Sequence, residues 1–235
     1  MVVGNSLIAG TVTRKGPRSC GFLLGCLVAL LVVFPFLEDV ARPLFLMLPL
    51  AAVFVGSVLA VDAERHYLHR ALIIAAFQVG FTALSLVIRE GDLFYWVALA
   101  LALVATAALI LFSTYCVLRY VLLARTITRD QIYAGICMYL MLGFAFGAVF
   151  YLVALLDRNS FAANVELLAR GDKPDLMYFS FVTLATLGYG DITPRTNLAR
   201  SLSVVEALAG MLYIAIFMAR LVSMHAEGPG SEQGE

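Results

Sequence analysis

The chain has 235 residues, of which 62% are hydrophobic and only 14% are charged. With a mean hydropathy of +0.94, this composition excludes a soluble globular domain and a disordered chain, and it indicates a protein embedded in a bilayer. Sixteen Lys and Arg balance sixteen Asp and Glu, so there is no basic surplus for nucleic acid. The cysteines lack C-x-x-C spacing, so we expect no disulfide framework, metal site or cofactor: Cys20, Cys26, Cys116 and Cys137.

Long runs without charge predict the membrane-spanning helices, because about 20 apolar residues cross a hydrocarbon core of roughly 30 Å. A sixth run, after five uninterrupted ones, contains a single acid, Glu206. The sequence therefore predicts an all-α membrane protein with six spanning helices. They cover residues 19–37, 43–61, 71–88, 93–118, 131–156 and 201–219.

The basic residues predict the orientation of these spans. With the N-terminus inside, nine of the sixteen Lys and Arg residues fall in inner segments and two in short outer loops. We therefore expect an uncleaved first helix and two cytoplasmic termini. The expected organisation is a tail at 1–18, a peripheral four-helix domain at 19–124, a pore domain at 125–222 and a tail at 223–235.

The segment between the fifth and sixth spans carries the chemistry. Residues 176–190 are free of charge but would reach only about 22 Å as a helix, which is too short to cross. Pro174 and Asp175 suit a first helical turn, so we predict a short helix to about Ala185 that breaks at the following glycines. Non-helical backbone at membrane depth is tolerated only inside protein or beside a water-filled cavity, so this segment indicates a pore.

Residues 186–191 resemble the selectivity-filter signature of potassium channels of the two-helix pore superfamily. The resemblance implies that four successive carbonyls and the first hydroxyl replace the water shell of a K⁺ ion. Such carbonyls must point one way, which requires backbone of alternating hand, and glycine reaches positive φ without penalty. The last residue would place a carboxylate at the outer mouth. The motif consists of Thr186, Leu187, Gly188, Tyr189, Gly190 and Asp191.

The resemblance extends over residues 125–222 and implies a bacterial plasma-membrane protein. Gly210 lies 24 residues after Thr186, where the superfamily often carries a gating-hinge glycine, although close helix packing also explains a glycine there. Because one chain supplies one filter strand, the resemblance implies a homotetramer that conducts K⁺ among membrane lipids.

The residues that support the filter depart from the family pattern. Tyr178 and Phe179 occupy positions that hold two tryptophans in many members, and Val182 stands where some members have a buried glutamate. With Thr183, they form the pore-helix side of the filter. Tyr178 can donate a hydrogen bond to the filter surround, whereas Phe179 cannot. A weakly selective cation channel is therefore the alternative to a K⁺-selective one.

The fourth predicted span tests for voltage gating. A voltage sensor needs several Arg or Lys spaced by three within the membrane, and residues 93–118 contain none. Arg119, Arg125 and Arg129 follow only afterwards. We therefore predict a channel that is not strongly voltage-gated, with a voltage-dependent channel of atypical sensor as the alternative.

Three smaller features have two interpretations each. His66 and His69 form either a metal or proton site or a solvated interfacial loop. Glu206, one turn above Gly210, would hydrogen-bond to the pore helix through Thr183 or Ser180, in a structural or a gating role. The third feature is a hydrophobic set near the inner end of the last span, which forms either a gate that closes by dewetting or ordinary packing. It consists of Ile214, Phe217 and Met218.

Two other functional classes are weaker. A multi-pass enzyme would need convergent catalytic groups, but the spans offer only Glu206, with no H-E-x-x-H motif and no Ser-His pairing, so we predict that the protein is not an enzyme. A non-conducting regulatory subunit is disfavoured by the intact filter motif.

Overall fold

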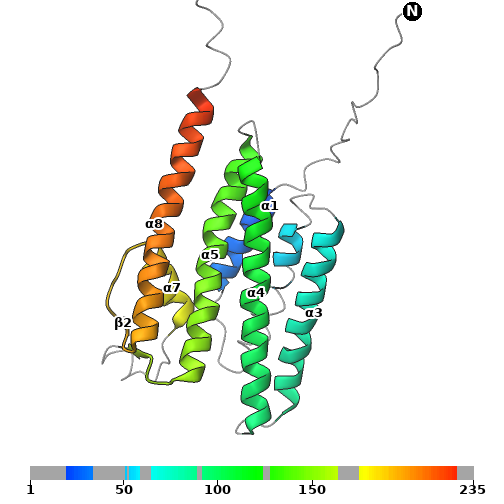
Figure 1. The fold of residues 1–235 in the computed structure, drawn as a ribbon, viewed down its shortest axis with the longest axis vertical. Coiled ribbons are helices and arrows are strands. Elements are labelled where there is room, and N and C mark those ends of the chain that lie inside the picture. Colours follow the sequence, from blue (N-terminus) through cyan, green and yellow to red (C-terminus); the bar gives the residue numbers. More distant parts are fainter. Residues whose placement is uncertain are drawn as a thin grey trace, which may run out of the picture.

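The computed structural model describes residues 20–33, 51, 53–58, 65–88, 92–123, 128–163 and 175–226. Six helices with assigned bounds and two short strands lie within them, and residues 51 and 53–58 are also helical (Figure 1). The helices are α1 (Cys20–Val33), α3 (Arg65–Val87), α4 (Leu93–Leu123), α5 (Arg129–Leu156), α7 (Leu176–Leu184) and α8 (Asn197–Ala226), and the strands are β1 (Phe161–Ala163) and β2 (Ile192–Pro194).

Four of the described helices are long and apolar enough to cross a membrane. The described part of helix α1 has 14 residues and covers about 21 Å. Most of the predicted span at 43–61, the tail at 1–18 and residues 227–235 lie outside the described residues, so six spans stay a prediction. The four candidate spans are His66–Ser85, Leu93–Arg119, Arg129–Leu156 and Asn197–Ser223.

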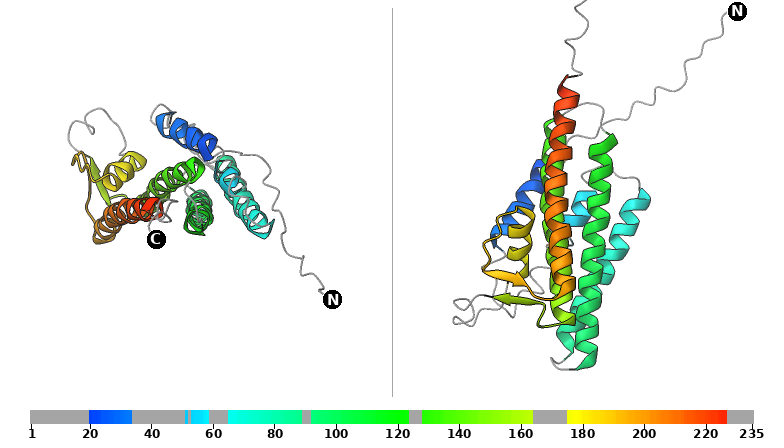
Figure 2. Two further views of the ribbon diagram at one scale, coloured as in Figure 1. Left: turned by 90° about the horizontal axis from the view of Figure 1, so that it is seen from above. Right: turned by 60° about the vertical axis from the view of Figure 1, so that its left-hand side comes forward.

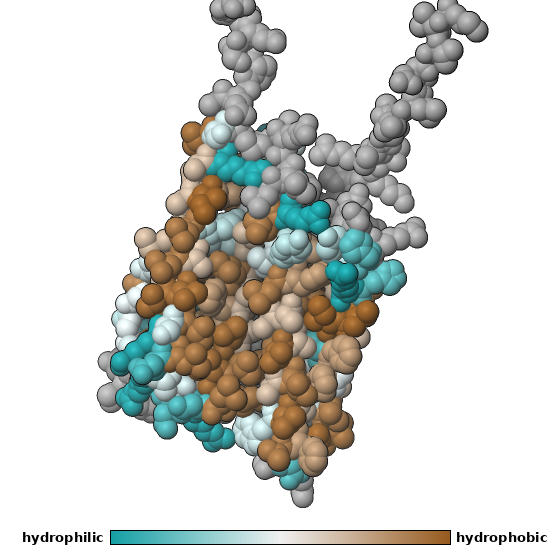
Figure 3. Space-filling view, viewed as in Figure 1, coloured by the Kyte–Doolittle hydropathy of each residue, from teal (hydrophilic) through white to brown (hydrophobic). Residues whose placement is uncertain are grey.

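Helix α5 lies in the middle of the molecule. Helices α1, α4, α7 and α8 pack around it, and α3 packs against α4 (Figure 2). Hydrophobic side chains cover the middle of the face shown in Figure 3, and hydrophilic ones gather toward its two ends. This distribution fits helices that cross a hydrocarbon layer.

The helices extend beyond the charge-free runs from which they were predicted. Helix α3 begins at Arg65, six residues before the predicted start, so His66 and His69 lie on its first turns rather than in a loop. Both histidines are exposed, and the described residues contain no cluster of three metal-ligating side chains. A charge-free run indicates only the part of a helix that lies in hydrocarbon. The helix itself can continue beyond that part, to the residue that caps it. Thr128 shows this, because it forms a capping box with Gln131 at the start of α5.

A two-stranded sheet joins the end of α5 to the segment after the filter motif, a departure from the all-α prediction. Strands β1 and β2 are antiparallel, with Phe161 opposite Pro194 and Ala163 opposite Ile192. Just beyond them, the Arg195 N–H donates to the Ser160 carbonyl at 2.8 Å. Strands of three residues are too short to show an alternating pattern, so the sequence gives no signal for this sheet.

One ridge of α5 makes several of the contacts with α7 and α8. Its members recur every fourth residue and so form a row that turns by about 40° around the helix from one member to the next. A Cβ atom added to Gly143 would lie 2.6 Å from the Phe181 ring, and one added to Gly147 would lie 2.5 Å from the Met177 sulfur. Small residues therefore let α7 approach the α5 backbone closely. The ridge consists of Gly135, Tyr139, Gly143, Gly147 and Tyr151.

Replacing Gly143 by Val should destabilise the protein, because the new methyl groups would enter the space of the Phe181 ring. Overpacking of this kind costs about 1–3 kcal/mol. The measurement is the thermal unfolding midpoint of the purified protein in detergent. The matched control is Gly80→Val on α3, where nothing lies within 4 Å of an added Cβ. Equal midpoints for the two variants would contradict the close contact.

Candidate functional site

The short helix α7 starts at an aspartate cap. The Asp175 carboxylate accepts the N–H groups of Met177 at 3.0 Å and Tyr178 at 3.2 Å, and it also accepts the Tyr151 hydroxyl at 3.3 Å. This N-cap satisfies two backbone donors and places a negative charge at the positive end of the helix dipole. The predicted short helix is thereby confirmed, with Ala185 as its C-cap.

The backbone after α7 alternates in hand. Thr186, Gly188 and Gly190 have positive φ values of 58°, 57° and 77°, whereas the residues between them do not. Nothing lies within 4 Å of a Cβ added to Gly188 or Gly190, so the positive φ rather than crowding favours glycine there. The alternation expected from the motif is present, and it turns successive carbonyls toward the same side.

The amide groups of this segment bond back to α7. The Thr186 N–H donates to the Thr183 carbonyl at 3.0 Å, and the Leu187 and Gly188 N–H groups donate to the Val182 carbonyl at 2.9 and 3.5 Å. Within the described part of the chain, no hydrogen bond ends on the carbonyls of residues 186–189. Four successive carbonyl oxygens are therefore open to a cation, for which carbonyls are suitable ligands.

Tyr178 and Asp191 meet beside this segment. The Tyr178 hydroxyl forms a hydrogen bond with the Asp191 side chain. Asp191 also accepts the Ile192 N–H at 3.0 Å. The two residues link the pore helix to the end of the filter motif, in the donor role that the sequence offered for Tyr178.

Phe179 is held by ring packing instead of a hydrogen bond. It is buried, and its ring lies 5.2 Å from Phe150 on α5 and 5.4 Å from Phe161 on β1, in edge-to-face geometry. Phe150 and Phe161 are themselves 5.6 Å apart. Such pairs contribute about 0.5–1.5 kcal/mol beyond their burial. The sequence showed the missing donor but not this cluster, whose members are far apart in the chain.

The C-terminal end of α7 rests on α5 and α8. The Tyr139 hydroxyl donates to the Leu184 carbonyl at 3.1 Å, and a Cβ added to Gly210 would lie 2.5 Å from the same oxygen. Gly210 is thus a point of close packing against α7, while its role as a hinge stays a prediction. Tyr139 was not predicted as a site residue. Its position four residues from both Gly135 and Gly143 could have indicated that it lies on the same ridge of α5.

Glu206 contacts α7 through Ser180 rather than Thr183. The carboxyl is fully buried, and its Oε1 atom lies 2.5 Å from the Ser180 hydroxyl oxygen. Ser180 also lies 2.7 Å from the Gly143 carbonyl. One serine therefore connects the acid on α8 with the backbone of α5.

The three residues predicted to form an inner constriction do not share one environment. Phe217 packs against α5, where its ring would meet a Cβ on Gly135 at 2.2 Å, and it stacks on Tyr213 at 5.7 Å. Ile214 and Met218 are about half exposed in the single chain, at 49% and 52%. Phe217 therefore packs within the chain, whereas Ile214 and Met218 are exposed.

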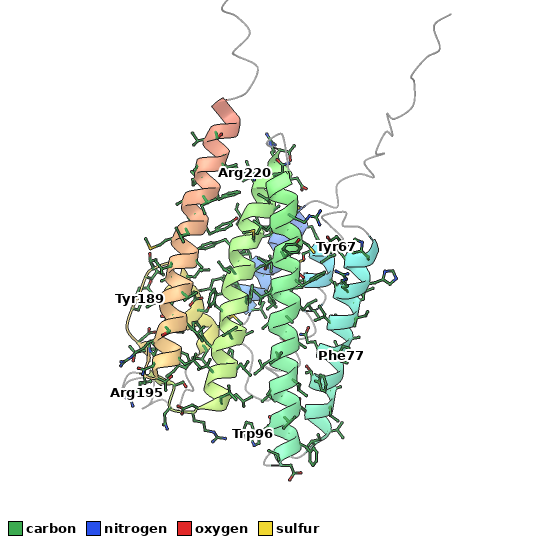
Figure 4. All side chains as sticks on the ribbon, in the orientation of Figure 1. Tyr67, Phe77, Trp96, Tyr189, Arg195 and Arg220 are labelled. Carbon is green, nitrogen blue, oxygen red and sulfur yellow. The ribbon has the colours of Figure 1, made fainter. Side chains whose placement is uncertain are left out.

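Arg119, which follows the charge-free run of α4, is tied to the neighbouring helix. Its guanidinium hydrogen-bonds to the Tyr67 hydroxyl on α3 and lies 5.7 Å from the centre of that ring. Figure 4 places Tyr67 and Arg220 toward one end of the molecule and Trp96 and Arg195 toward the other. No described residue within α4 before Arg119 carries a positive charge.

The second half of the chain is similar to known ion channels. Residues 137–227 match the family model described as "Ion channel". The chain is 35% identical over 95 residues to "Two pore potassium channel c" of Oryza sativa subsp. japonica, which covers 40% of this chain and 20% of the relative. It is 32% identical over 100 residues to "Two-pore potassium channel 3" of Arabidopsis thaliana, covering 43% and 20%.

A similarity also reaches an archaeal protein. The chain is 32% identical over 73 residues to "Probable potassium channel protein 2" of Methanocaldococcus jannaschii, which covers 31% of this chain and 21% of the relative. The chain thus spans about a fifth of the length of these relatives. No solved structure matches significantly. The helices and these similarities together support a multi-pass membrane protein whose residues 137–227 are channel-like.

Proposed function

We propose that the chain is the subunit of a homotetrameric, K⁺-selective channel that conducts K⁺ passively across a bacterial plasma membrane. One observation carries the proposal: the backbone of residues 186–190 alternates in hand while the amides of residues 186–188 bond back to Val182 and Thr183. Among the described residues, no hydrogen-bond donor reaches the carbonyl oxygens of residues 186–189. A dehydrated K⁺ ion, which is the only ligand proposed, would take the place of such a donor.

One chain provides only part of the oxygen shell of a K⁺ ion, and a tetramer would provide the rest. Four copies around an axis would convert each carbonyl into a ring, so that an ion between two rings meets eight oxygens. The α7 helix would direct its partly negative C-terminal end toward the central cavity, which favours a cation there. Much of α8 supports subunit contacts, because its apolar side chains are exposed in the single chain. They include Leu208, Met211 and Leu212.

The orientation proposed is two cytoplasmic termini, with the filter motif near the outer surface. Asp191 would then contribute one carboxylate per subunit to the outer mouth. The Phe179 ring cluster and the link between Tyr178 and Asp191 favour a rigid filter surround, and hence the selective channel over a weakly selective cation pore. A channel, unlike an enzyme, needs no catalytic side chains at these positions.

The first test is the reversal potential of the purified protein in a planar bilayer, with KCl on one side and NaCl on the other. We expect reversal close to the K⁺ equilibrium potential. Gly188→Ala should abolish the preference, because alanine at positive φ costs about 1–2 kcal/mol per residue. Leu187→Val is the matched control and should keep it, since only the backbone of that residue faces the ion. Reversal near zero for the unmodified protein would contradict the proposal.

The same bilayer tests the absence of a voltage sensor. Each charge that crosses 100 mV contributes about 2.3 kcal/mol, and α4 offers none before Arg119. We therefore expect an open probability that changes little between about −100 and +100 mV. Arg119→Gln should leave this flat dependence unchanged. A steep dependence that disappears in Arg119→Gln would instead indicate an atypical sensor.

A third test concerns the inner end of α8. We propose Ile214 and Met218 as the hydrophobic constriction and leave Phe217 out because it packs on Gly135. Ile214→Ser should raise the open probability several-fold, because a polar side chain keeps a narrow pore hydrated. The matched control is Ile216→Ser, which is also exposed but lies on another face of α8. Equal effects of the two substitutions would contradict a gate at Ile214.

A further inference from the structure

The hydrogen bonds around Ser180 fix the position of a proton. The Ser180 hydroxyl oxygen lies 2.7 Å from the Gly143 carbonyl oxygen and 2.5 Å from Glu206 Oε1, and both distances are those of O–H···O hydrogen bonds. A serine hydroxyl has a single hydrogen to donate, and a backbone carbonyl has none. The Ser180 hydrogen therefore belongs to the bond with Gly143. The second bond needs a hydrogen from the carboxyl of Glu206.

An ionised Glu206 does not satisfy the same atoms. If Ser180 gave its hydrogen to a carboxylate, the 2.7 Å contact with the Gly143 carbonyl would contain no hydrogen. The other carboxylate oxygen, Oε2, is buried and has no hydrogen-bond partner within the described residues. A charged oxygen without a partner in an apolar interior is far more costly than a neutral one.

The groups that face Glu206 do not compensate for a negative charge. Among the described residues, the Ser180 hydroxyl of α7 contacts Glu206, and Tyr139 is the titratable group of α5 on which its charge acts. The Tyr139 hydroxyl already donates to the Leu184 carbonyl. On α8 itself, the arginines Arg200 and Arg220 lie six and fourteen residues away along the helix, at its ends.

We propose that Glu206 is a protonated carboxylic acid that donates to Ser180 and thereby positions the filter. The relay runs from Glu206 on α8, through Ser180 on α7, to the Gly143 carbonyl on α5, and so fixes the pore helix between two spanning helices. Ser180 is two residues before Val182, whose carbonyl holds the Leu187 amide. Glu206 is thus a positioning residue. The effect on current rests on the proposed channel function, whereas the protonation does not.

Infrared difference spectroscopy tests the proton directly. The unmodified protein and Glu206→Gln would be reconstituted in vesicles of phosphatidylethanolamine and phosphatidylglycerol at neutral pH. We expect a carbonyl stretching band of a protonated carboxylic acid that is absent from Glu206→Gln. In Ser180→Ala the band should remain but shift, because the acid loses its hydrogen-bond acceptor. Absence of the band from the unmodified protein would overturn the proposal.

Currents from the same vesicles test the positioning role. Glu206→Gln should keep the K⁺ current within about twofold, because its amide still donates to Ser180, whereas Glu206→Leu and Ser180→Ala should each reduce it about tenfold or more. Thr106→Val is the matched control, since this buried hydroxyl bonds only to the Ala102 carbonyl of its own helix. Full current in both Glu206→Leu and Ser180→Ala would overturn the role. If the unmodified protein carries no K⁺ current, the proposed function fails, while the infrared result still decides the protonation.

Discussion

The structure depends on how the C-terminal end of α7 is capped. The last four carbonyls of any helix lack partners within it, and a helix that stops at membrane depth cannot give them to water. Here the chain that follows satisfies three of them, through the N–H groups of residues 185–188, and Tyr139 satisfies the fourth. Residues 185–188 are therefore the cap of α7, and they include the start of the proposed filter. The amides of residues 186–188 bond to α7, whereas no described donor bonds to the carbonyls of residues 186–189.

This arrangement explains why the α5 ridge is built from glycine and tyrosine. Helix α7 has only nine residues, six of which are buried. The glycines bring the α5 backbone within contact of Phe181 and Met177, and Gly143 presents its carbonyl to Ser180. The tyrosines then reach the two ends of α7, with Tyr151 bonded to the Asp175 cap and Tyr139 bonded to Leu184. Both ends and the middle of α7 are thus fixed to one helix.

The sequence predicted the parts of this site that depend on local chemistry. Charge-free runs located the long helices, because the cost of a charge in hydrocarbon is independent of the fold. The cap at Asp175 and the glycines at positive φ were likewise readable, because each reflects the conformation of its own residue. Contacts between distant segments were not readable. The Phe150, Phe161 and Phe179 cluster, the pairing of β1 with β2 and the direction of Phe217 all depend on which helix faces come together.

The α5 helix is also the main physical connection between the two halves of the chain. On its other side, the Asp130 carboxylate accepts the Cys20 N–H at 2.8 Å, which fixes the start of α1 to the first turn of α5, and α4 packs along its length. On the face toward α7, the glycines let the Met177 and Phe181 side chains pack directly on the α5 backbone. A movement of the peripheral helices that shifts α5 would therefore also act on these two residues of α7. Within the described residues, α5 is thus the main route of contact from α1 and α4 to α7.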